Sequence, residues 1–507
     1  MLRQIDFYLN KITMYRLTLY VLYGLVGAAV ILSFFGILHA NPVDLIIDTL
    51  GAIFAAEISN KILAKIFHAS TNTESATITA LILVLIMPTA FPMYFLFLLA
   101  ACLLAMLSKY IVAIEKQHVF NPAAVAVLAI ALVSNTSASW WIGTPVMLPF
   151  VLVGGLLLAR KIQRKQMLGI FFATYFLLTG LFAFFQGGFL HVLPIWQAGI
   201  LDSAVFFFGF IMFTEPLTSP NRSLLRNSYA VLVAILFVSP IFQLPFVLTP
   251  EMALCFGNIF SYFSSPKYRL ILPLLTKKFS ANTGVFAFSL PTQLAFLPGQ
   301  YMEWTLPHEK TDDRGNRRYF SIASSPTEKE LLLTVKFYEP SSSYKAKLQT
   351  LEKHDTILAA SLEGDFVLPK NLQTPLVFLA GGVGIAPFRS MIKYLIDKRL
   401  QADITLFYAN RTADEIVFQN VFTEAKRNGV KTIYTLTDTK KAPKNWQDET
   451  GRITEKMLEK YVKDLQNSIF YLSGPQNMVD SFADMLKKLH IPKSHIKQDF
   501  FPGYSEK

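Results

Sequence analysis

Cysteine and charged residues are scarce in this chain. Only two of its 507 residues are cysteines, Cys102 and Cys255, and both fall inside apolar runs. This leaves no disulfide framework, no zinc site and no cysteine spacing for an iron–sulfur cluster. Charged residues make up 16% of the chain, against about a quarter in ordinary soluble proteins. Much of the positive excess behind the net charge of +12 sits in short loops between apolar runs, so it does not indicate nucleic acid as a partner.

The shortage of charge is confined to one half of the chain. Residues 17–263 consist of apolar runs with few charges, whereas residues 267–507 have the composition of a soluble protein. The first run, Leu17–Leu38, is long enough to cross a bilayer and lacks the small-residue cleavage site of a signal peptide. We therefore expect a transmembrane domain over residues 1–266 and soluble domains after it.

Ten apolar segments can be marked in the first half, each bounded by polar residues, proline or glycine. They span roughly residues 17–38, 43–64, 76–88, 92–108, 122–134, 145–159, 167–186, 199–213, 228–248 and 251–263. Together they predict a polytopic α-helical membrane bundle of about ten helices. Several are shorter than the ~20 residues of a simple span. Either they are broken helices around a buried site, or their boundaries lie a few residues away.

Positive charge alternates from one turn of this map to the next. Every second turn carries lysine or arginine: Lys61 and Lys65, then Lys109 and Lys116, then Arg160, Lys161, Arg164 and Lys165, then Arg222 and Arg226. The turns between them, at residues 40–42, 88–92, 134–144, 187–197 and 249–250, contain neither residue. This pattern predicts that the N-terminus and the second half are cytoplasmic. We expect an integral protein of the bacterial inner or plasma membrane, in contact with membrane lipid.

Two polar strings interrupt the apolar half. Phe120–Ala124 opens the fifth segment and contains Asn121, and Met212–Pro220 closes the eighth and contains Thr214 and Glu215. Polar groups at the ends of apolar segments are costly unless they are paired or hydrated. They are either helix caps and turn formers, as Asn121 before a proline suggests, or the lining of a flavin or quinone site.

Both strings resemble those of the membrane subunit shared by sodium-pumping NADH:quinone reductases and Rnf complexes. The resemblance covers about residues 15–265 and implies ten helices that hold flavin. That family carries covalent FMN on the threonine of a Ser-Gly-Ala-Thr string, which is absent here. Thr144 follows a glycine in a corresponding outer turn, but a helix N-cap before Pro145 is the favoured interpretation. We expect the flavin or quinone to bind non-covalently near Asn121 and Glu215.

Haem is disfavoured in this bundle. Ferric reductases and NADPH oxidases also join a membrane bundle to a flavoprotein, but they need axial histidines that face each other inside the bilayer. The four histidines of the first half fall in loops or at segment ends, and no segment offers two of them: His39, His68, His118 and His191.

The second half changes from one pattern to another. From about Arg269 to residue 370, alternating apolar runs such as Gly284–Leu290 and Thr356–Ser361 predict a small antiparallel β-barrel. Over residues 371–507, strands and helices alternate, which predicts a doubly wound α/β domain. The expected strands are 375–380, 403–409, 430–435 and 468–473, and the expected helices are 387–399, 414–428, 452–466 and 475–489.

Two strings in this half point to nucleotide binding. In the first, Arg318–Pro326, Arg318 suits a diphosphate because guanidinium groups bind phosphate with two charge-assisted hydrogen bonds. The second, Gly381–Pro387, joins a strand to a helix. Its glycines, Gly381, Gly382 and Gly384, let the backbone approach a diphosphate at the helix N-terminus, and Pro387 follows them.

The order of these elements over residues 269–507 resembles the ferredoxin–NAD(P)⁺ reductase superfamily. This implies FAD as the cofactor and NAD(P)H as the electron donor. Arg318 would then bind the FAD diphosphate, Phe320 would lie against the isoalloxazine ring and Ser321 would hydrogen-bond its N5 edge. Ser343 sits where the family has a Gly-x-x-Ser turn, but the glycine is missing.

The same resemblance assigns residues to the nicotinamide nucleotide. Arg411 either binds a ribose 2′-phosphate or caps a helix. Ser473 replaces the family's cysteine near the nicotinamide, and Gly474 keeps the loop. Phe501, in the tail Asp499–Tyr504, would border the flavin.

The fusion predicts a membrane-bound FAD-dependent NAD(P)H oxidoreductase. Electrons would pass from cytoplasmic NAD(P)H through FAD to a flavin, such as FMN, or a quinone in the bundle, and could continue to an extracytoplasmic electron carrier. Two alternatives remain: a redox-driven Na⁺ or H⁺ pump, for which Asp48 and Glu57 would be tested, and a membrane-anchored reductase of a soluble carrier. The polar strings argue against a mere anchor.

Overall fold

The computed structural model of the protein describes residues 5, 8–9, 12–67, 73–89, 91–114, 117–134, 136–162, 164–201, 204–239, 248–265, 269–290, 294–309, 311–312 and 315–499. Its contacts divide the chain into two compact units, Met1–Lys267 and Tyr268–Lys507. Within the described residues, the first unit has one large apolar core and the second has several smaller ones.

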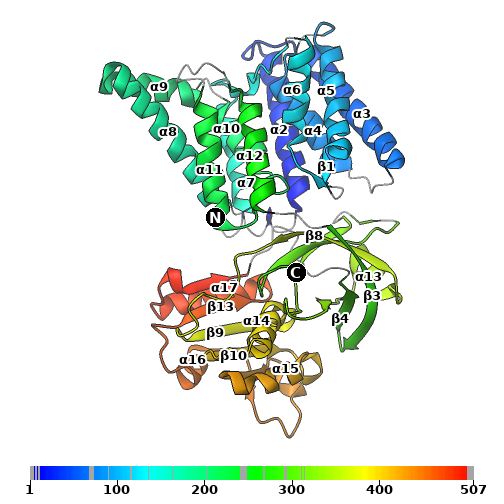
Figure 1. The fold of residues 1–507 in the computed structure, drawn as a ribbon, viewed down its shortest axis with the longest axis vertical. Helices are drawn as coiled ribbons and strands as arrows, with labels where there is room; N and C mark the ends of the chain where they lie inside the picture. The colour runs from blue at the N-terminus through cyan, green and yellow to red at the C-terminus, as the bar shows by residue number, and fades with distance from the viewer. Residues whose placement is uncertain are drawn as a thin grey trace. The chain divides into compact units, whose positions relative to one another are not determined.

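The first unit is built from helices (Figure 1). In chain order they are α2 (Met14–Phe34), α3 (Pro42–Ile66), α4 (Thr73–Ile86), α5 (Phe95–Ile111), α6 (Pro122–Ser134), α7 (Leu148–Ile162), α8 (Lys165–Gly187), α9 (Phe189–Leu201), α10 (Val205–Phe207), the π-helix η2 (Phe208–Met212), α11 (Ser223–Val238) and α12 (Pro250–Ser264). Helix α4 lies deepest: residues 80–86 are all buried, because a helix that is apolar on every side can bury every face.

Proline and its neighbours start several of these helices. Asn41 precedes Pro42 and accepts a hydrogen bond from the Val43 N–H at 2.9 Å, and Thr249 caps α12 in the same way before Pro250. A proline in the first turn loses no helical hydrogen bond there, and the capping side chain satisfies an N–H that would otherwise lack a partner.

One expected turn is a helix. Residues 187–197 were predicted as a turn from their glycines and His191, but residues 189–201 form α9, which packs against α8. The Trp196 indole N–H donates to the Phe176 carbonyl at 2.9 Å and ties the two helices together. The turn between α8 and α9 is Gly188 alone, whose φ of +74° suits glycine.

Few of the helices reach the length of a membrane span. By length and composition, α2 and α8 are long and apolar enough to cross a bilayer, and the bent pair formed by α9 and residues 205–212 would be a third. Shorter apolar helices, of 10–17 residues, are α4, α5, α6 and α11. The prediction of a membrane bundle of about ten helices is thus supported in part: the described helices are many, but only two or three of them qualify as spans.

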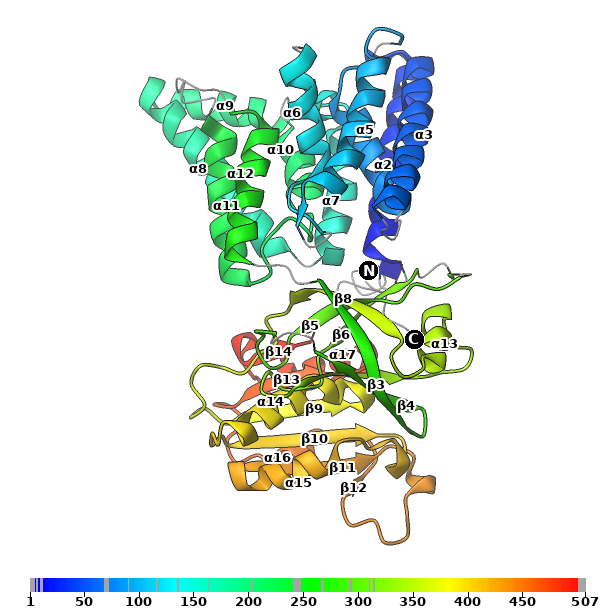
Figure 2. The same cartoon turned by 45° about the vertical axis from the view of Figure 1, so that its right-hand side comes forward.

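The second unit begins with an antiparallel sheet of six strands in the order β6-β5-β8-β3-β4-β7 (Figure 2). The strands are β3 (Arg269–Ser280), β4 (Thr283–Ser289), β5 (Tyr301–Thr305), β6 (Arg317–Ser321), β7 (Glu330–Lys336) and β8 (Thr356–Glu363). Alternate side chains of these strands form one core with the short helix α13 (Ser343–Thr350).

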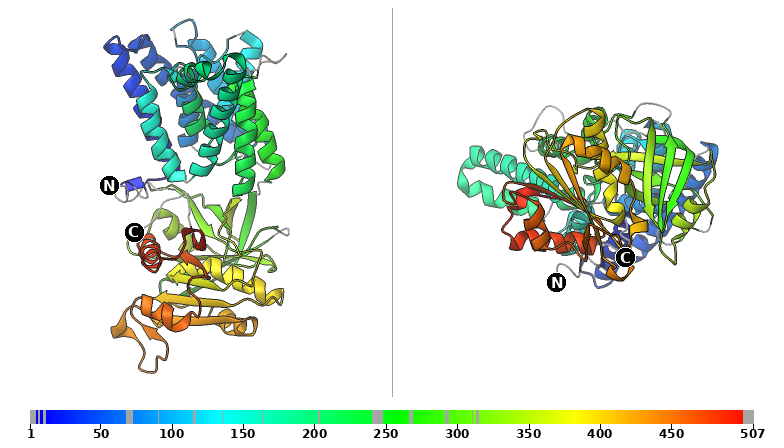
Figure 3. Two further views of the ribbon diagram at one scale, coloured as in Figure 1. Left: turned by 90° about the vertical axis from the view of Figure 1, so that its left-hand side faces the viewer. Right: turned by 90° about the horizontal axis from the view of Figure 1, so that it is seen from below.

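A parallel sheet follows, in the order β12-β11-β10-β9-β13-β14. Its strands are β9 (Leu376–Gly381), β10 (Ile404–Asn410), β11 (Val430–Leu436), β12 (Glu449–Thr450), β13 (Ile469–Ser473) and β14 (Ile496–Gln498). Helices α14 (Ile385–Asp397) and α15 (Gln419–Glu424) pack on one face, and α16 (Glu455–Tyr461) and α17 (Gln476–Lys488) on the other. The left view of Figure 3 lets the antiparallel sheet, in light green, and the parallel sheet, in yellow to red, be followed separately.

Candidate functional site

Strand β6 carries predicted flavin contacts, and two of them face one aromatic ring. Arg318 and Phe320 are two residues apart, so their side chains leave the strand on the same face. The Arg318 guanidinium carbon lies 5.1 Å from the centroid of the Tyr344 ring, and the Phe320 ring centroid lies 6.1 Å from it. Burial raises the pKa of the Tyr344 hydroxyl, which keeps it neutral. The sequence reasoning had assigned no role to Tyr344.

Ser343 holds the start of α13 in place. Its hydroxyl accepts from the Asp312 N–H at 2.9 Å and bonds the His308 imidazole at 3.0 Å, while its own N–H donates to the Asp312 carboxylate at 2.9 Å. Arg318 also lies 4.0 Å from that carboxylate. The guanidinium and the N-terminus of α13 thus lie on the same side of the sheet, and their chemistry fits a diphosphate such as that of FAD.

Asp499 brings together two predicted residues from different sheets. Its carboxylate oxygen Oδ2 accepts from the Ser473 hydroxyl at 2.9 Å and from the Ser321 hydroxyl at 3.4 Å. Asp499 follows β14, and its N–H donates to the Leu472 carbonyl at 2.9 Å, which fixes it beside the end of β13. The predicted flavin edge and the predicted nicotinamide loop therefore meet at one carboxylate. Sequence reasoning placed Asp499 only in the tail pattern.

The glycine loop packs against that nicotinamide loop. A side chain at Gly384 would meet the Ser473 carbonyl oxygen at 2.4 Å and the Gly474 nitrogen at 2.6 Å. Gly384 is therefore required for contact between two backbone segments, whereas we had expected a side chain there to intrude on the diphosphate path. Gly382 has a φ of +53° and open space around it, so it is the loop position where a left-handed conformation matters.

Gly381 and Pro387 lie on either side of the Gly382–Gly384 turn. Gly381 ends β9, and a side chain there would meet the Met478 sulfur at 2.3 Å. Pro387 is buried in the first turn of α14, where its missing N–H leaves no helical bond unmade. The loop thus turns directly from strand to helix.

Arg411 lies just after β10 and is mostly exposed. Its side chain is 71% exposed and its Nε lies 3.8 Å from the Asp438 carboxylate, while its backbone N–H donates to Glu415 at 3.2 Å. Of the two expected roles, a 2′-phosphate contact and a helix cap, neither is tested by this geometry. Phe501 falls outside the described residues, which end at 499.

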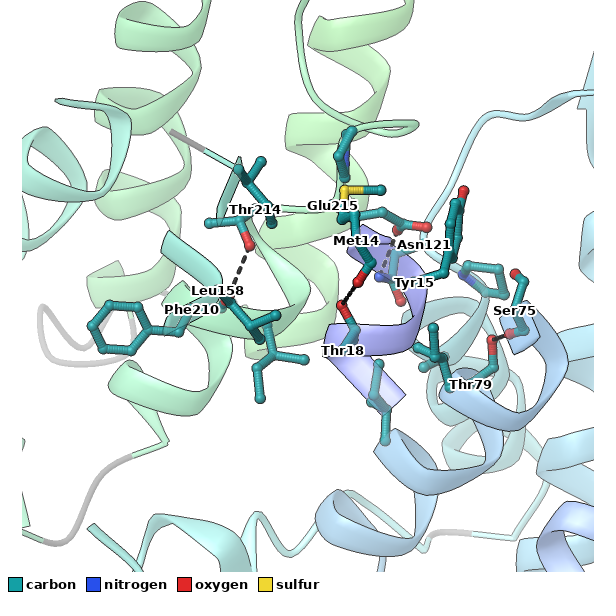
Figure 4. A pocket seen from close by; sticks show the side chains of 17 residues that line it. Met14, Tyr15, Thr18, Ser75, Thr79, Asn121, Leu158, Phe210, Thr214 and Glu215 are labelled. Carbon is teal, nitrogen blue, oxygen red and sulfur yellow. Dashed lines mark hydrogen bonds between the residues drawn. The ribbon is translucent and has the colours of Figure 1, made fainter. Parts of the chain in front are cut away.

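The first unit contains a pocket with about 70 Å³ of accessible space. It is lined by the N-terminal turns of α2, α4 and α6, the C-terminal turn of α7, and the end of η2. Three predicted residues line it, namely Asn121, Thr214 and Glu215 (Figure 4). Asn121 is 93 or more residues from the other two in sequence, so the helix packing alone brings them together. A π-helix such as η2 is often found at a functional site.

Glu215 is the centre of the polar contacts in this pocket. Its Oε2 accepts from the Asn121 amide at 2.9 Å and from the Thr218 hydroxyl at 3.1 Å, and its Oε1 lies 3.4 Å from His118 Nε2. Asn121 also caps α6, since its Oδ1 accepts from the Ala124 N–H at 3.1 Å. Asn121 is therefore a helix cap, as one interpretation held, and it also lines a pocket; that this pocket takes a flavin or quinone stays a prediction.

Thr144 does not belong to this pocket. It precedes α7, whereas the pocket residues Leu158 and Ile162 lie at the other end of that helix, roughly 20 Å away at 1.5 Å per residue. The Thr144 hydroxyl oxygen is buried, and no described residue hydrogen-bonds to it. Thr214 lines the pocket, but its hydroxyl donates to the Phe210 carbonyl at 2.7 Å.

Comparison with known proteins identifies the reductase part. The model of the oxidoreductase NAD-binding domain matches residues 378–484, which include the glycine loop and Ser473. The human "Oxidoreductase NAD-binding domain-containing protein 1" is 30% identical over 227 residues, which are 40% of this chain and 69% of that protein. An antiparallel sheet followed by a doubly wound sheet with a glycine loop defines the class as a two-domain flavin- and nicotinamide-dependent reductase. The chain belongs to the ferredoxin–NAD(P)⁺ reductase family of oxidoreductases through this half.

Two other relatives are bacterial. The chain is 30% identical over 211 residues to the "Anthranilate 1,2-dioxygenase electron transfer component" of Acinetobacter baylyi, covering 41% of this chain and 59% of that protein. It is 29% identical over 210 residues to one component of the "Na(+)-translocating NADH-quinone reductase" of Pseudoalteromonas atlantica, covering 38% and 50%. The chain thus spans little more than half the length of these relatives.

Proposed function

We propose that this protein is a membrane-bound NAD(P)H oxidoreductase that passes electrons from the second unit to a quinone or flavin held in the first. The observation that carries the proposal is the Ser321–Asp499–Ser473 arrangement. It holds together a flavin-edge residue and a nicotinamide-loop residue, which must meet if a hydride is to pass between the two cofactors.

The residues of the second unit would have separate tasks. Arg318 and the N-terminus of α13 would hold the FAD diphosphate, and the glycine loop at the start of α14 would hold that of NAD(P)H. FAD held by these residues would supply the chemistry that links two-electron transfer from NAD(P)H to one-electron transfer. Asp499 would hold Ser321 and Ser473 beside each other by accepting a hydrogen bond from each of their hydroxyls.

The proposal places the acceptor in the pocket of the first unit. Asn121 and Glu215 offer an amide and a carboxylate in a largely apolar bundle, and polar groups there are typical of a functional site. The alternating lysines and arginines favour a membrane-spanning bundle with the reductase unit in the cytoplasm. The likeness of the two polar strings to a quinone-reductase membrane subunit favours the same conclusion, and so does a relative named as part of a quinone reductase.

The test compares two acceptors with the full-length protein purified in detergent. Ferricyanide takes electrons from a reduced flavoprotein directly, whereas menadione or a short-chain ubiquinone tests the pocket. We expect about one FAD per chain, reduction of both acceptors by NADH or NADPH, and loss of bound FAD in Arg318→Ala. A protein that holds FAD and reduces ferricyanide, but no quinone and no added FMN, would contradict the acceptor assignment.

A redox-driven ion pump is the second candidate. It is favoured by carboxylates away from the pocket: Asp48 on α3 and Glu251 on α12 are 1% and 2% exposed. Glu57 on α3, also expected to be relevant, accepts from the Thr77 hydroxyl at 3.2 Å. If electron transfer drives Na⁺ or H⁺, quinone reduction in sealed vesicles should rise when a sodium or proton ionophore is added. Equal rates with and without ionophores would contradict pumping.

A further inference from the structure

We propose that Glu215 delivers protons to a quinone-class acceptor in the pocket, and that His118 supplies those protons to Glu215 from solvent. The inference rests on the proposed function, because it assumes that the pocket holds the electron acceptor. The proposed function describes only the path of the electrons, and the inference adds a path for protons. It also limits the acceptor to the class of molecules that take up protons when they are reduced.

The balance of the reaction requires such a route. NAD(P)H loses two electrons and a proton on becoming NAD(P)⁺, and these leave in the second unit. A quinone that gains two electrons in the pocket must also gain two protons to become a quinol. Most of the side chains that line the pocket are apolar, so we expect a titratable side chain to bring these protons.

Glu215 is the group in the right place. Of the described residues that line the pocket, Glu215 is the only one with a carboxylate, and Tyr15 is the only other titratable one. The remaining polar groups of the lining are hydroxyls and an amide, from Thr18, Ser75, Thr79, Asn121 and Thr214. These can hydrogen-bond a carbonyl oxygen, but they do not gain and lose a proton near neutral pH. Figure 4 shows Glu215 beside Asn121, with Tyr15 nearby from α2.

His118 is placed to reload Glu215. It belongs to β2 (Gln117–His118), which pairs with β1 (Ala113–Ile114) and packs against α5. Its Nε2 lies 3.4 Å from Glu215 Oε1, whereas Asn121 and Thr218 hydrogen-bond to the other carboxylate oxygen, Oε2. The side chains of His118 and Glu215 are 13% and 24% exposed, so both are partly buried, and His118 contacts a residue that lines the pocket. Imidazole exchanges protons near neutral pH, which suits a group that takes a proton from water and passes it on.

Other charged and titratable groups surround the pair. Lys109 on α5 donates to Ser75 and Thr79 at 3.0 to 3.1 Å, and both of these residues line the pocket. Among the described residues, Tyr15 on α2 lines the pocket, and Tyr229 and Arg164 lie near the 214–219 turn. Lys109 would balance the Glu215 charge when its proton has gone to the acceptor.

The experiment uses the full-length protein with NADH and two acceptors, ferricyanide and menadione, in light and heavy water. In His118→Gln we expect menadione reduction to fall by about 100-fold, the lower end of what a positioned general acid contributes. Its rate should fall as pH rises and show a larger solvent isotope effect. Ferricyanide reduction, which takes up no proton, should stay within about twofold. Glu215→Gln should behave like His118→Gln, and Glu215→Asp should recover part of the rate.

His191→Gln is the matched control, because His191 is a histidine of α9 that does not line the pocket and bonds the Gly187 carbonyl. It should leave both activities unchanged. The proton route is overturned if His118→Gln and Glu215→Gln reduce menadione like the wild type, or if His118→Gln lowers both activities equally with no change in isotope effect. If the wild type itself reduces ferricyanide but no quinone, the acceptor assignment fails first, and the proton route fails with it.

Discussion

The two candidate sites of this protein are assembled in different ways. In the second unit, Ser473 and the glycine loop lie at the ends of neighbouring parallel strands, β13 and β9, which pair directly. In the first unit, Asn121 and Glu215 meet although their segments are about 90 residues apart and no strand register links them. The comparison shows that one site is set mainly by backbone geometry, whereas the other is set by side chains that helix packing brings together.

The largest effect should come from the backbone-defined site. Gly384→Val should abolish NAD(P)H oxidation with ferricyanide, because its side chain would collide with the Ser473 carbonyl oxygen, 2.4 Å from the position of the first added carbon. That oxygen belongs to the backbone and cannot rotate away. The assay is ferricyanide reduction, with bound FAD measured from the visible spectrum.

Gly382→Ala is the matched control for this loop. It has open space but a φ of +53°, so alanine should cost about 1 kcal/mol and leave most of the activity. If Gly384→Val remains active, the prediction that position 384 requires glycine for its close contact with residues 473–474 is wrong.

The next effect concerns the carboxylate that joins the two loops. Asp499→Asn should lower NAD(P)H oxidation by about 100-fold, the loss expected when reacting groups shift by about 1 Å. It weakens the contacts to Ser473 and Ser321 without emptying the FAD site. Stopped-flow reduction of the bound FAD by NADH measures the step directly. Asp480→Asn, an exposed carboxylate of α17, should be unchanged; equal rates in the two variants would remove Asp499 from the site.

A smaller effect is expected in the helical unit. Asn121→Ala removes the cap of α6 and the amide bond to Glu215, and a lost cap costs roughly 0.5 to 2 kcal/mol. Because the two units have separate cores, only the unfolding transition of the first unit should shift. Scanning calorimetry, with FAD release as the marker of the second unit, separates them.

Asn41→Ala is the control, since Asn41 caps α3 before a proline but has no contact with Glu215 recorded in the structure. The extra loss in Asn121→Ala measures the bond to Glu215. Equal shifts in the two variants would make Asn121 a helix cap alone, and a shift of FAD release would show that the units unfold together.

The same contrast explains how much could be predicted from the sequence. The four strands and four helices expected over residues 375–489 occur in the predicted order, whereas the short strands β12 and β14 were not predicted. The family match covers residues 378–484. In a doubly wound fold the carboxyl ends of the strands share one edge, so a loop motif predicts its own position. Tyr344 and Asp499 could not be placed in this way, because their roles depend on side-chain contacts across the sheets.

The helical unit was harder to predict for a physical reason. Apolar composition predicts helix, but it does not distinguish a span from a short helix, and it does not define which faces meet. The glycines and His191 suggested a turn where α9 forms, because nothing in the local sequence records the Trp196 contact to α8. Asn121 and Glu215 were chosen for their polarity among apolar residues, and the structure brings them together because such groups need partners in a bundle; their role as a cofactor site stays a prediction.

The smallest effect should come from Thr144, which tests the boundary between the two kinds of site. Its hydroxyl is buried and no described residue hydrogen-bonds to it, so Thr144→Val should change the stability of the first unit by less than about 1 kcal/mol. A covalent flavin would need this hydroxyl to be free to react and would make the denatured protein fluoresce in a gel.

We expect a dark band in both wild type and variant, with unchanged menadione reduction, because the pocket lies at the other end of α7. A fluorescent band in the wild type that disappears in Thr144→Val would place a flavin at residue 144. Such a site would be of a third kind, because Thr144 lies neither at the edge of a parallel sheet nor in the pocket between the helices.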